Sequence, residues 1–264
     1  MNKIILLLSA ACAIMPLFGG CNAPKEEPGT QVIAHRGYWD CEGSAQNSIA
    51  SLQKAGEIGV YGSEFDVNLT SDSVLVVNHD NNFKGYPVQQ TAYSIIKDSL
   101  LSNGEKLPTL EEYLQAGKEM PALKMIFELK TDAESPQEAV AIAQSLKMIK
   151  EMGMEQQVEF ISFSLNACKE FARLMPDNEV AYLGGKYSPK ELKEMGITAL
   201  DYHYSNFQEH PEWVKEAHEF GMKVNVWTVN KEEVIAEMIA LGVDYITTDK
   251  PEEVAALITD LHLQ

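Results

Sequence analysis

The chain has 264 residues, of which 45% are hydrophobic and 23% charged, enough for one large folded domain or two small ones. Its 21 basic and 39 acidic residues give a net charge of -18, which argues against nonspecific binding to nucleic acid. An anionic substrate would therefore need local positive charge at its site, from side chains or a metal ion.

The N-terminus carries an export signal rather than part of the fold. Lys3 precedes the apolar run IILLLSAACAIMPLFGG, which is too short and wrongly flanked for a stable membrane span. The run ends in small residues before Cys21, a pattern that resembles a bacterial lipoprotein signal, in which this cysteine becomes the lipidated N-terminus. An ordinary cleaved signal followed by an incidental cysteine is the alternative.

The next residues, NAPKEEPGTQ at 22–31, predict a flexible tether rich in proline, glycine and charge. We therefore expect a signal peptide at 1–20, a lipidated cysteine with its tether at 21–31 and a folded domain at 32–264. Such a chain would be an exported bacterial lipoprotein. It would be anchored to a membrane through its N-terminal lipid and face the periplasm or the cell surface.

Beyond the tether, short apolar runs alternate with longer amphipathic segments. The apolar runs predict strands at 32–35, 62–68, 74–78, 123–129, 158–163, 179–183, 197–201, 222–228 and 243–247. The amphipathic segments predict helices at 47–59, 109–118, 136–151, 165–174, 189–195, 211–220, 231–241 and 251–261. Prolines near helix starts and glycines after helix ends mark several of these boundaries.

Several predicted strands, such as KMIFEL and KVNVWTV, are nearly continuous apolar runs. Such runs are typical of a parallel sheet buried on both faces. A series of βα units about 230 residues long therefore predicts a (β/α)8, or TIM, barrel. A doubly wound open sheet is the alternative, but no glycine-rich nucleotide-binding motif supports it. The Gly/Pro-punctuated segment after Asp80 is expected to be a small insertion after the second barrel strand, over the barrel mouth.

Carboxylates occupy inward-facing positions near the ends of two predicted strands. Glu64 and Asp66 are two residues apart in EFD and so share one face of their strand, and Glu128 lies near the end of FEL. Active sites of such barrels gather at the C-terminal ends of the strands. Three carboxylates cannot share a low-dielectric site unpaired, and a divalent cation would resolve their repulsion. Oxygen-only ligands favour Mg2+ or Ca2+ over zinc.

Cationic and titratable side chains lie at the same strand ends. His35 and Arg36 end the first strand, and His79 ends the extended run that follows the second. Lys130 ends the strand that contains FEL. Two histidines beside a metal can supply a general acid and a general base near neutral pH, and an arginine fork suits a phosphate. With no G-x-S-x-G elbow to supply a serine nucleophile, the set favours phosphoester cleavage over acyl transfer.

In their order along the chain, the motifs HRG, QNS, EFD, HD, LPTLEEYL and FELK resemble the glycerophosphodiester phosphodiesterase family, and the resemblance extends to the final DYITTDKPE. The resemblance implies a TIM barrel that uses a divalent metal to hydrolyse glycerophosphodiesters to glycerol 3-phosphate and an alcohol. It also implies a set of site residues by position: metal ligands Glu64, Asp66 and Glu128, an acid–base pair His35 and His79, and phosphate contacts Arg36 and Lys130. Trp227 would be an aromatic wall against the glycerol moiety, or alternatively a core aromatic of a buried strand.

Two segments depart from the family pattern. Gln46-Asn47-Ser48 stands where the family usually has Glu-Asn-Thr, so a negative charge near the metal is lost at Gln46. Asn47 is still expected to cap the following helix. NNFKGYPVQQT stands where Arg-Thr-Thr commonly follows His-Asp, in the part of the family that shapes the substrate entrance.

The expected partner is a small-molecule phosphodiester, bound with one divalent cation, either Mg2+ or Ca2+. Three other functions remain open. A tethered enzyme could release headgroups from lysophospholipids or cleave other phosphodiesters, or the barrel could be a catalytically silent lipoprotein that binds a phosphodiester. A metal-dependent sugar isomerase would also use carboxylates and histidine, but it would give Arg36 beside His35 no clear task.

Overall fold

The computed structural model describes residues 29–132 and 135–262. The predicted signal peptide, Cys21 and most of the predicted tether lie outside the described residues. The described part covers nearly all of the segment that was expected to fold. Within it, none of the helices combines the length and the apolar character needed to cross a membrane.

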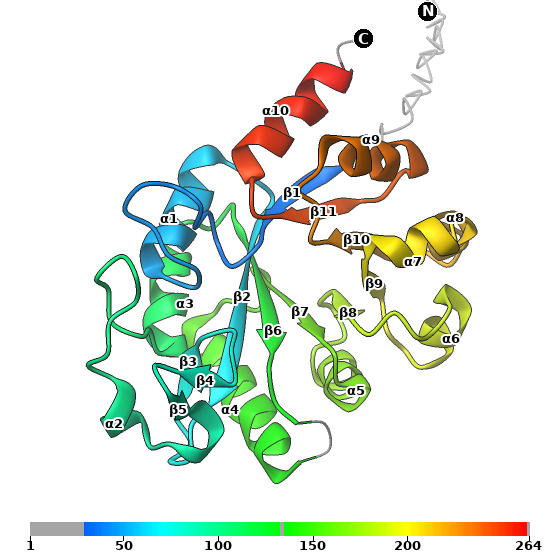
Figure 1. The fold of residues 1–264 in the computed structure, drawn as a ribbon. Coiled ribbons are helices and arrows are strands. Elements are labelled where there is room, and N and C mark those ends of the chain that lie inside the picture. The colour runs from blue at the N-terminus through cyan, green and yellow to red at the C-terminus, as the bar shows by residue number, and fades with distance from the viewer. Residues whose placement is uncertain (1–28, 133–134, 263–264) are drawn as a thin grey trace, which may run out of the picture.

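The strands form a closed barrel of eight parallel strands (Figure 1). In order around the barrel they are β1 (Gln31–Ala34), β2 (Gly62–Leu69), β6 (Lys124–Leu129), β7 (Val158–Ser162), β8 (Val180–Tyr182), β9 (Ala199–His203), β10 (Lys223–Trp227) and β11 (Tyr245–Thr248). Because β1 pairs in parallel with both β2 and β11, the sheet has no open edge between them. The predicted (β/α)8 barrel is confirmed, and the open doubly wound sheet is excluded.

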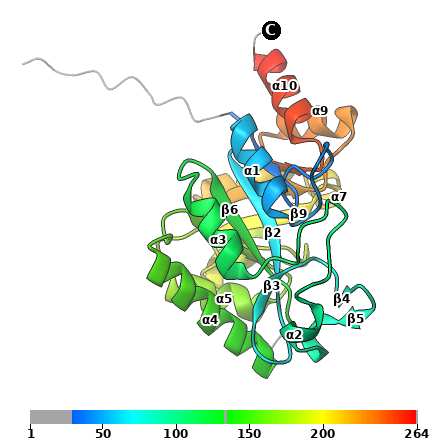
Figure 2. The same ribbon diagram turned by 90° about the vertical axis from the view of Figure 1, so that its left-hand side faces the viewer.

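Helices surround the barrel on its outer face (Figures 1 and 2). They are α1 (Ile49–Ile58), α3 (Leu110–Lys118), α4 (Pro136–Met152), α5 (Leu165–Leu174), α6 (Pro189–Glu194), α8 (Glu212–Glu219), α9 (Glu232–Leu241) and α10 (Pro251–His262), with a further short helix, α7 (Tyr204–Glu209), directly after β9. Side-chain caps fix several helix starts. The Ser135 side chain accepts a hydrogen bond from the backbone of Glu138, and Ser188 forms a capping box with Glu191.

Two apolar layers bury the barrel strands on both faces. The larger layer packs between the strands and the helices and includes Phe65, Phe127 and Phe160. The smaller layer fills the barrel interior and consists of Ile33, Ile126, Ile161, Ala181, Leu183, Ala199 and Tyr245. Since successive strand residues point to opposite faces, the same strands also place inward-facing polar side chains above and below this interior layer.

The segment after β2 leaves the barrel. β3 (Leu75–Val77) pairs antiparallel with β2, so the strand predicted at 74–78 exists but is not a barrel strand. β4 (Asn82–Phe83), β5 (Tyr86–Pro87), the 3-10 helix η1 (Val88–Gln90) and α2 (Tyr93–Ile96) follow, and they pack on a small core of Val76, Phe83, Val88, Ile96 and Leu107. Figure 2 shows β4, β5 and α2 gathered at one side of the barrel. The predicted insertion is confirmed, but elements of two to four residues are too short to give a periodic signal in the sequence.

The chain turns sharply where β1 ends. Gly37 has a φ of +77°, a left-handed conformation that glycine adopts without strain. A Cβ atom at this position would collide with the side chain of Ser51 in α1. The backbone N–H of Gly37 donates to the carbonyl of Glu64 at 3.1 Å. Glycine at this position therefore lets the end of β1 lie directly against both α1 and β2.

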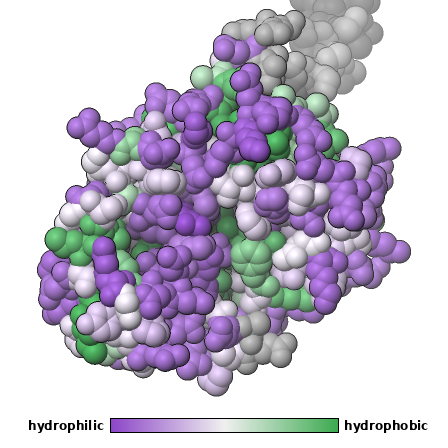
Figure 3. All heavy atoms as spheres, viewed as in Figure 1, coloured by the Kyte–Doolittle hydropathy of each residue, from purple (hydrophilic) through white to green (hydrophobic). Residues whose placement is uncertain are grey.

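Polar residues dominate the surface. Figure 3 shows one face of the molecule, on which hydrophilic residues predominate and hydrophobic residues form small, separate areas. Small, separate apolar areas of this kind are usual on the surface of a folded domain.

Candidate active site

Three carboxylates meet inside the barrel on the adjacent strands β2 and β6. Asp66 and Glu128 are register partners across this strand pair, and Glu64 lies two residues before Asp66 on the same face. One carboxylate oxygen from each residue lies within 4.8 Å of the other two. The residues are only 3% (Glu64), 1% (Asp66) and 6% (Glu128) exposed. The structure thus brings together the three residues that the sequence predicted as metal ligands.

Cationic groups neutralise this cluster only in part. Lys130 Nζ lies 2.8 Å from Glu128 Oε1 and 3.2 Å from Asp66 Oδ1. The Arg36 Nε atom lies 3.7 Å from Asp66 Oδ2, and the Arg36 backbone N–H donates to Glu64 Oε2 at 2.7 Å. Glu64 Oε1, however, is buried without a hydrogen-bond partner. A buried carboxylate oxygen is unfavourable in this state unless a further positive group contacts it.

Burial and mutual repulsion separate the pKa values of the three acids. Burial, with the charges of the two neighbouring carboxylates, raises the pKa of Glu64 well above its ordinary value. Burial and the charge of Asp66 raise the pKa of Glu128 to about 8. Burial also acts to raise the pKa of Asp66, but Lys130 first, together with His79, the hydrogen bond from Asn47 and the charge of Arg36, leaves this pKa below its ordinary value. Asp66 is therefore the acid that stays ionised most readily.

The donor set fits a divalent cation. All three candidate ligands offer carboxylate oxygens, which hard cations such as Mg2+ and Ca2+ prefer. Lys130 balances only one of the three negative charges, and the unpartnered Glu64 Oε1 provides a ligand atom that no protein group uses. Glu64, Asp66 and Glu128 could hold such an ion.

Asn47 hydrogen-bonds to Asp66 of the acidic cluster and does not cap α1. Its side-chain N–H2 donates to Asp66 Oδ2 at 2.8 Å, and its side-chain oxygen accepts from the Asp66 backbone N–H at 3.1 Å. The cap of α1 is Ser48, whose hydroxyl accepts from the backbone of Ser51 at 3.0 Å. The prediction that Asn47 caps the helix was therefore wrong. With a φ of +60°, Asn47 turns its side chain away from the helix and toward β2.

Gln46 fixes the guanidinium group of the site. Arg36 Nη1 donates to Gln46 Oε1 at 2.8 Å. Because the amide is neutral, it orients Arg36 without cancelling its charge. Gln46 makes its contact with the predicted phosphate ligand Arg36 rather than with the three carboxylates.

His35 belongs to a hydrogen-bonded pair that joins the two ends of the barrel sheet. Its Nδ1 atom lies 2.7 Å from Asp249 Oδ1, just beyond β11, which pairs with β1. Trp39 Nε1 donates to the same oxygen at 3.0 Å, and Asn230 Nδ2 donates to Asp249 Oδ2 at 2.7 Å. Burial alone would raise the pKa of Asp249, but these partners, His35 foremost, hold it down at about 2. An ionised Asp249 accepts a hydrogen bond from His35 Nδ1–H, which leaves Nε2 to face the site.

Sequence analysis did not identify Asp249, although it lies within the segment TTDKPE that formed part of the resemblance. Nothing along the chain connects it to His35, which is 214 positions away. The closing of the barrel is what makes the strands of these two residues neighbours.

His79 reaches the site by an unexpected route. It was predicted at the end of the extended run that follows the second strand, and this run, β3, pairs antiparallel with β2. The chain therefore returns toward Asp66, whose carbonyl accepts from the backbone N–H of Asn78 at 2.9 Å. His79 Nδ1 lies 2.8 Å from the exposed Asp80 Oδ1, and burial lowers the pKa of His79 below its ordinary value.

These groups share one cavity of about 270 Å³ at the C-terminal ends of the strands. Its lining comprises His35, Arg36, Glu64, His79, Glu128, Lys130, Ile161, Phe163, Leu183, Asp201, Trp227, Thr228 and Thr247. Each of the predicted site residues within the described range lines it except Asp66, which lies directly behind Lys130. Charged groups on one side face a largely apolar wall on the other.

An aromatic pair forms part of this apolar wall. Trp227 packs edge-on against Phe163 with ring centroids 5.7 Å apart, and Trp227 Nε1 donates to the carbonyl of Asp201 at 2.9 Å. Lys130 Nζ lies 5.8 Å from the centre of the Phe163 ring. Trp227 is half-buried at the cavity rather than enclosed in the core. Phe163, which is 50% exposed, was not singled out from the sequence.

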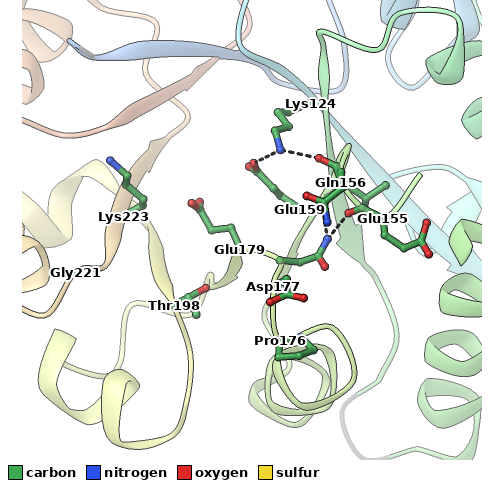
Figure 4. Close-up of a pocket in the computed structure, with 12 residues that line it drawn as sticks. Lys124, Glu155, Gln156, Glu159, Pro176, Asp177, Glu179, Thr198, Gly221 and Lys223 are labelled. Atoms are coloured by element: carbon green, nitrogen blue, oxygen red, sulfur yellow. Dashed lines mark hydrogen bonds and ion pairs between the residues drawn. The ribbon is translucent and has the colours of Figure 1, made fainter. Parts of the chain in front are cut away.

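A second cavity, of about 370 Å³, lies at the opposite end of the barrel (Figure 4). Tyr61 donates to Glu159 Oε1 at 2.6 Å, and Lys124 Nζ lies 3.4 Å from the same oxygen. Glu179 also points into this cavity, and burial together with Glu159 raises its pKa to about 8. Among the described residues, no histidine or cysteine lines this cavity. Polar contacts at the N-terminal end of a barrel contribute to stability rather than to catalysis.

Comparison with known proteins decides the family. A sequence profile described as "Glycerophosphoryl diester phosphodiesterase family" matches residues 35–253. The chain belongs to this family. It is therefore an enzyme of the phosphoric diester hydrolase class, as the order of its motifs predicted.

Relatives match over almost their whole lengths. A "Glycerophosphodiester phosphodiesterase" of Caldanaerobacter subterraneus subsp. tengcongensis is 32% identical over 248 residues, which cover 87% of this chain and 98% of the relative. A glycerophosphodiester phosphodiesterase from Parabacteroides distasonis, known from a crystal structure, is 53% identical in sequence to this chain. The two structures have a TM-score of 0.87, and the match covers 89% of this chain and 98% of that one. A phosphodiesterase of Oleispira antarctica, solved in complex with the product sn-glycerol-3-phosphate, is 26% identical, with a TM-score of 0.73 over 87% of this chain and 96% of that one.

Removal of the Asp249 carboxylate should impair this enzyme through His35. Asp249→Asn should lower kcat about 10- to 100-fold with little change in KM, because His35 loses the partner that fixes its tautomer. Steady-state kinetics on a phosphodiester substrate measure this split. Asp80→Asn is the matched control: Asp80 also contacts a histidine Nδ1, but its side chain is 77% exposed, so the loss should be much smaller. Equal losses in the two variants would contradict a special role for Asp249.

Without a divalent cation, the protein should lose stability as the pH rises from about 6.5 to 8. The pKa of Glu128 is raised to about 8 and that of Glu64 is also raised, so the folded state retains protons that the unfolded state has already released. Asp201 and Glu179, with pKa values raised to about 7 and about 8, act in the same direction. The contribution of each acid to stability is complete below its ordinary pKa and disappears as the pH passes through the raised value. The depressed pKa of His79 acts only below this window.

Thermal unfolding across this pH range, with and without Mg2+ or Ca2+, measures the effect. The cation should flatten the dependence because it keeps the carboxylates ionised. Glu128→Gln, which cannot ionise at this position, should show a shallower slope in the absence of metal. A melting temperature that rises with pH in the metal-free enzyme would contradict the expectation.

Proposed function

We propose that the enzyme is a metal-dependent phosphodiesterase that hydrolyses glycerophosphodiesters to glycerol 3-phosphate and an alcohol. The observation that carries the proposal is the convergence of a buried three-carboxylate cluster, two histidines and two cationic side chains on one cavity. Family membership supports the class of reaction. The Oleispira antarctica phosphodiesterase, a structural relative, was solved with sn-glycerol-3-phosphate as its product.

The positive side of the cavity would bind the phosphate. Glu64, Asp66 and Glu128 would hold one divalent cation, Mg2+ or Ca2+, which when bound supplies Lewis-acid polarisation of a phosphoryl oxygen. Arg36, oriented by Gln46 through its Nη1 atom, would donate hydrogen bonds to the phosphate. These donors would be in place before the reaction begins, so they would stabilise the charge of the transition state without reorganisation.

The two histidines would move the protons. One imidazole would accept a proton from the nucleophile, which is either water or the 2-hydroxyl of the substrate itself. The other would donate a proton to the leaving alkoxide, which is a poor leaving group without it. His35 and His79 each contact a carboxylate through Nδ1, so Nε2 would be the reacting nitrogen of both.

A screen for hydrolysis with Mg2+ or Ca2+ tests this function. Wild-type protein should release glycerol 3-phosphate from glycerophosphodiesters, and chelation should abolish the release. Headgroup release from lysophospholipids without turnover of glycerophosphodiesters would instead support a lysophospholipase D-like activity. Binding of a phosphodiester without turnover would support a silent binding lipoprotein, and sugar isomerisation alone would support an isomerase.

Two histidine variants should separate the acid from the base. His35→Ala and His79→Ala should each lower the rate on glycerophosphodiesters by about 100-fold or more. With bis(p-nitrophenyl) phosphate, whose leaving group needs no protonation, the variant that lacks the general acid should recover most of the lost rate. Full activity of either variant on glycerophosphodiesters would contradict the assignment of the pair.

We also propose that the enzyme is an exported bacterial lipoprotein held at a membrane by lipid on Cys21. The sequence supports this through the apolar run that ends in Gly-Gly-Cys and the tether that follows. Cells grown with radioactive palmitate should label the wild-type chain but not Cys21→Ala. Equal labelling of both, or export with cleavage and no labelling, would contradict the lipid anchor.

A further inference from the structure

Asp201 is a buried carboxylate whose position neither the barrel nor the proposed phosphate site explains. It lies on β9, is 2% exposed and lines the catalytic cavity. Its Oδ1 atom is buried without a hydrogen-bond partner. The predicted strand at 197–201 made it a terminal residue, whereas the observed β9 places it mid-strand, in register with Asn225 of β10.

The surroundings make this carboxylate unfavourable for stability. Ile161 and Leu183 line the same cavity and belong to the apolar interior layer of the barrel. Burial raises the pKa of Asp201 to about 7, although a side-chain hydrogen bond with Asn225 opposes the shift. A buried polar atom that lacks a partner destabilises the folded state. An apolar side chain would serve the fold better, so the retention of an acid here points to a ligand.

The order of the strands shows which part of a ligand Asp201 would meet. In the closed barrel, β9 is four strands away from β2 in either direction and so lies across the cavity from Glu64 and Asp66. A phosphate held at the carboxylate side would direct its organic substituent toward β9 and β10. The Trp227 ring borders this region and is fixed there by its hydrogen bond to the Asp201 carbonyl at 2.9 Å.

We propose that Asp201 is a specificity-determining residue that hydrogen-bonds a hydroxyl group of the glycerol moiety while Trp227 covers its carbon face. This assignment rests on the proposed function. A small polyol presents C–H groups and hydroxyls together. The side of the cavity formed by β9 and β10 likewise combines an apolar surface, the Trp227 ring, with one buried oxygen that lacks a partner, Asp201 Oδ1. A substrate ammonium group is the alternative occupant, and the comparison of substrates below distinguishes the two. A hydroxyl can also pair with either protonation state of a carboxyl group, as donor to one and acceptor from the other.

Asp201→Leu tests the proposal because it keeps the branched shape and removes the oxygens. The ratio of kcat/KM for glycerophosphoglycerol to that for bis(p-nitrophenyl) phosphate should fall about 10- to 100-fold, the usual effect of losing a hydrogen bond to a charged group. The ratio for glycerophosphoethanolamine should fall equally. Asp201→Asn, which keeps an acceptor oxygen, should recover most of the loss. The melting temperature of Asp201→Leu should equal or exceed that of the wild type, since the unpartnered oxygen is gone.

Glu179→Leu is the matched control, since it removes a carboxylate of raised pKa from the other end of the barrel (Figure 4). Its substrate ratios should remain those of the wild type. Asp201→Ala, which adds no atoms to the cavity, repeats the test if the leucine variant does not fold.

Three results would overturn the proposal. Equal losses of kcat/KM on bis(p-nitrophenyl) phosphate and on the glycerol diesters would mean that Asp201 does not hydrogen-bond the glycerol moiety. A loss confined to glycerophosphoethanolamine would mean that the group bound is an ammonium. Unchanged ratios together with a lower melting temperature would mean a structural role. Failure of the proposed function is distinguishable, because wild-type protein would then hydrolyse no glycerol diester at all.

Discussion

The acidic cluster on β2 and β6 imposes the constraint on which the rest of the site depends. Carboxylates buried this closely repel one another, and each must be matched by a cation or by hydrogen-bond donors. Lys130 and the Arg36 backbone supply part of this compensation, and Asn47 holds Asp66 from the other side. The oxygen that remains without a partner, on Glu64, is the reason to infer a bound cation. Two of the side chains near the cluster, Arg36 and Lys130, are also those that we propose to contact the phosphate.

Because the barrel is closed, strands that are far apart in the sequence line one cavity, and different strands would face the two ends of a bound substrate. Barrel closure makes β1 a neighbour of both β2 and β11, so His35 lies between the acidic cluster and Asp249. The opposite wall, on β9 and β10, combines the Trp227 ring with the buried carboxylate of Asp201. Polar contacts at the N-terminal end, around Glu159, close the barrel without catalytic groups. Glu64 and Asp201, which each have a buried oxygen without a partner, line the cavity at the C-terminal end, where a ligand can relieve this unfavourable burial.

Much of the site was predictable because parallel strands place their C-terminal ends together. Several site residues can be recognised from the local sequence alone. Glu64 and Asp66 alternate along one strand, the first strand ends at His35-Arg36, and FELK forms a motif of its own. The exceptions share a physical cause. Asp249 and Asp201 look like ordinary acids in the sequence, since their importance comes from neighbours on other strands. Asn47 resembled a helix cap because caps are local, whereas its actual partner, Asp66, lies across the fold.

The sequence by itself determined the barrel, the order of its units and the residue types that converge at one end, because hydrophobic periodicity and strand endings are local properties. Only the tertiary structure decided that β3 turns back to bring His79 toward Asp66, and that Gln46 contacts Arg36 rather than the acidic cluster. It also decided which carboxylates lack partners. Burial and pairing depend on contacts between residues far apart in the chain, and no pattern within a single segment encodes them.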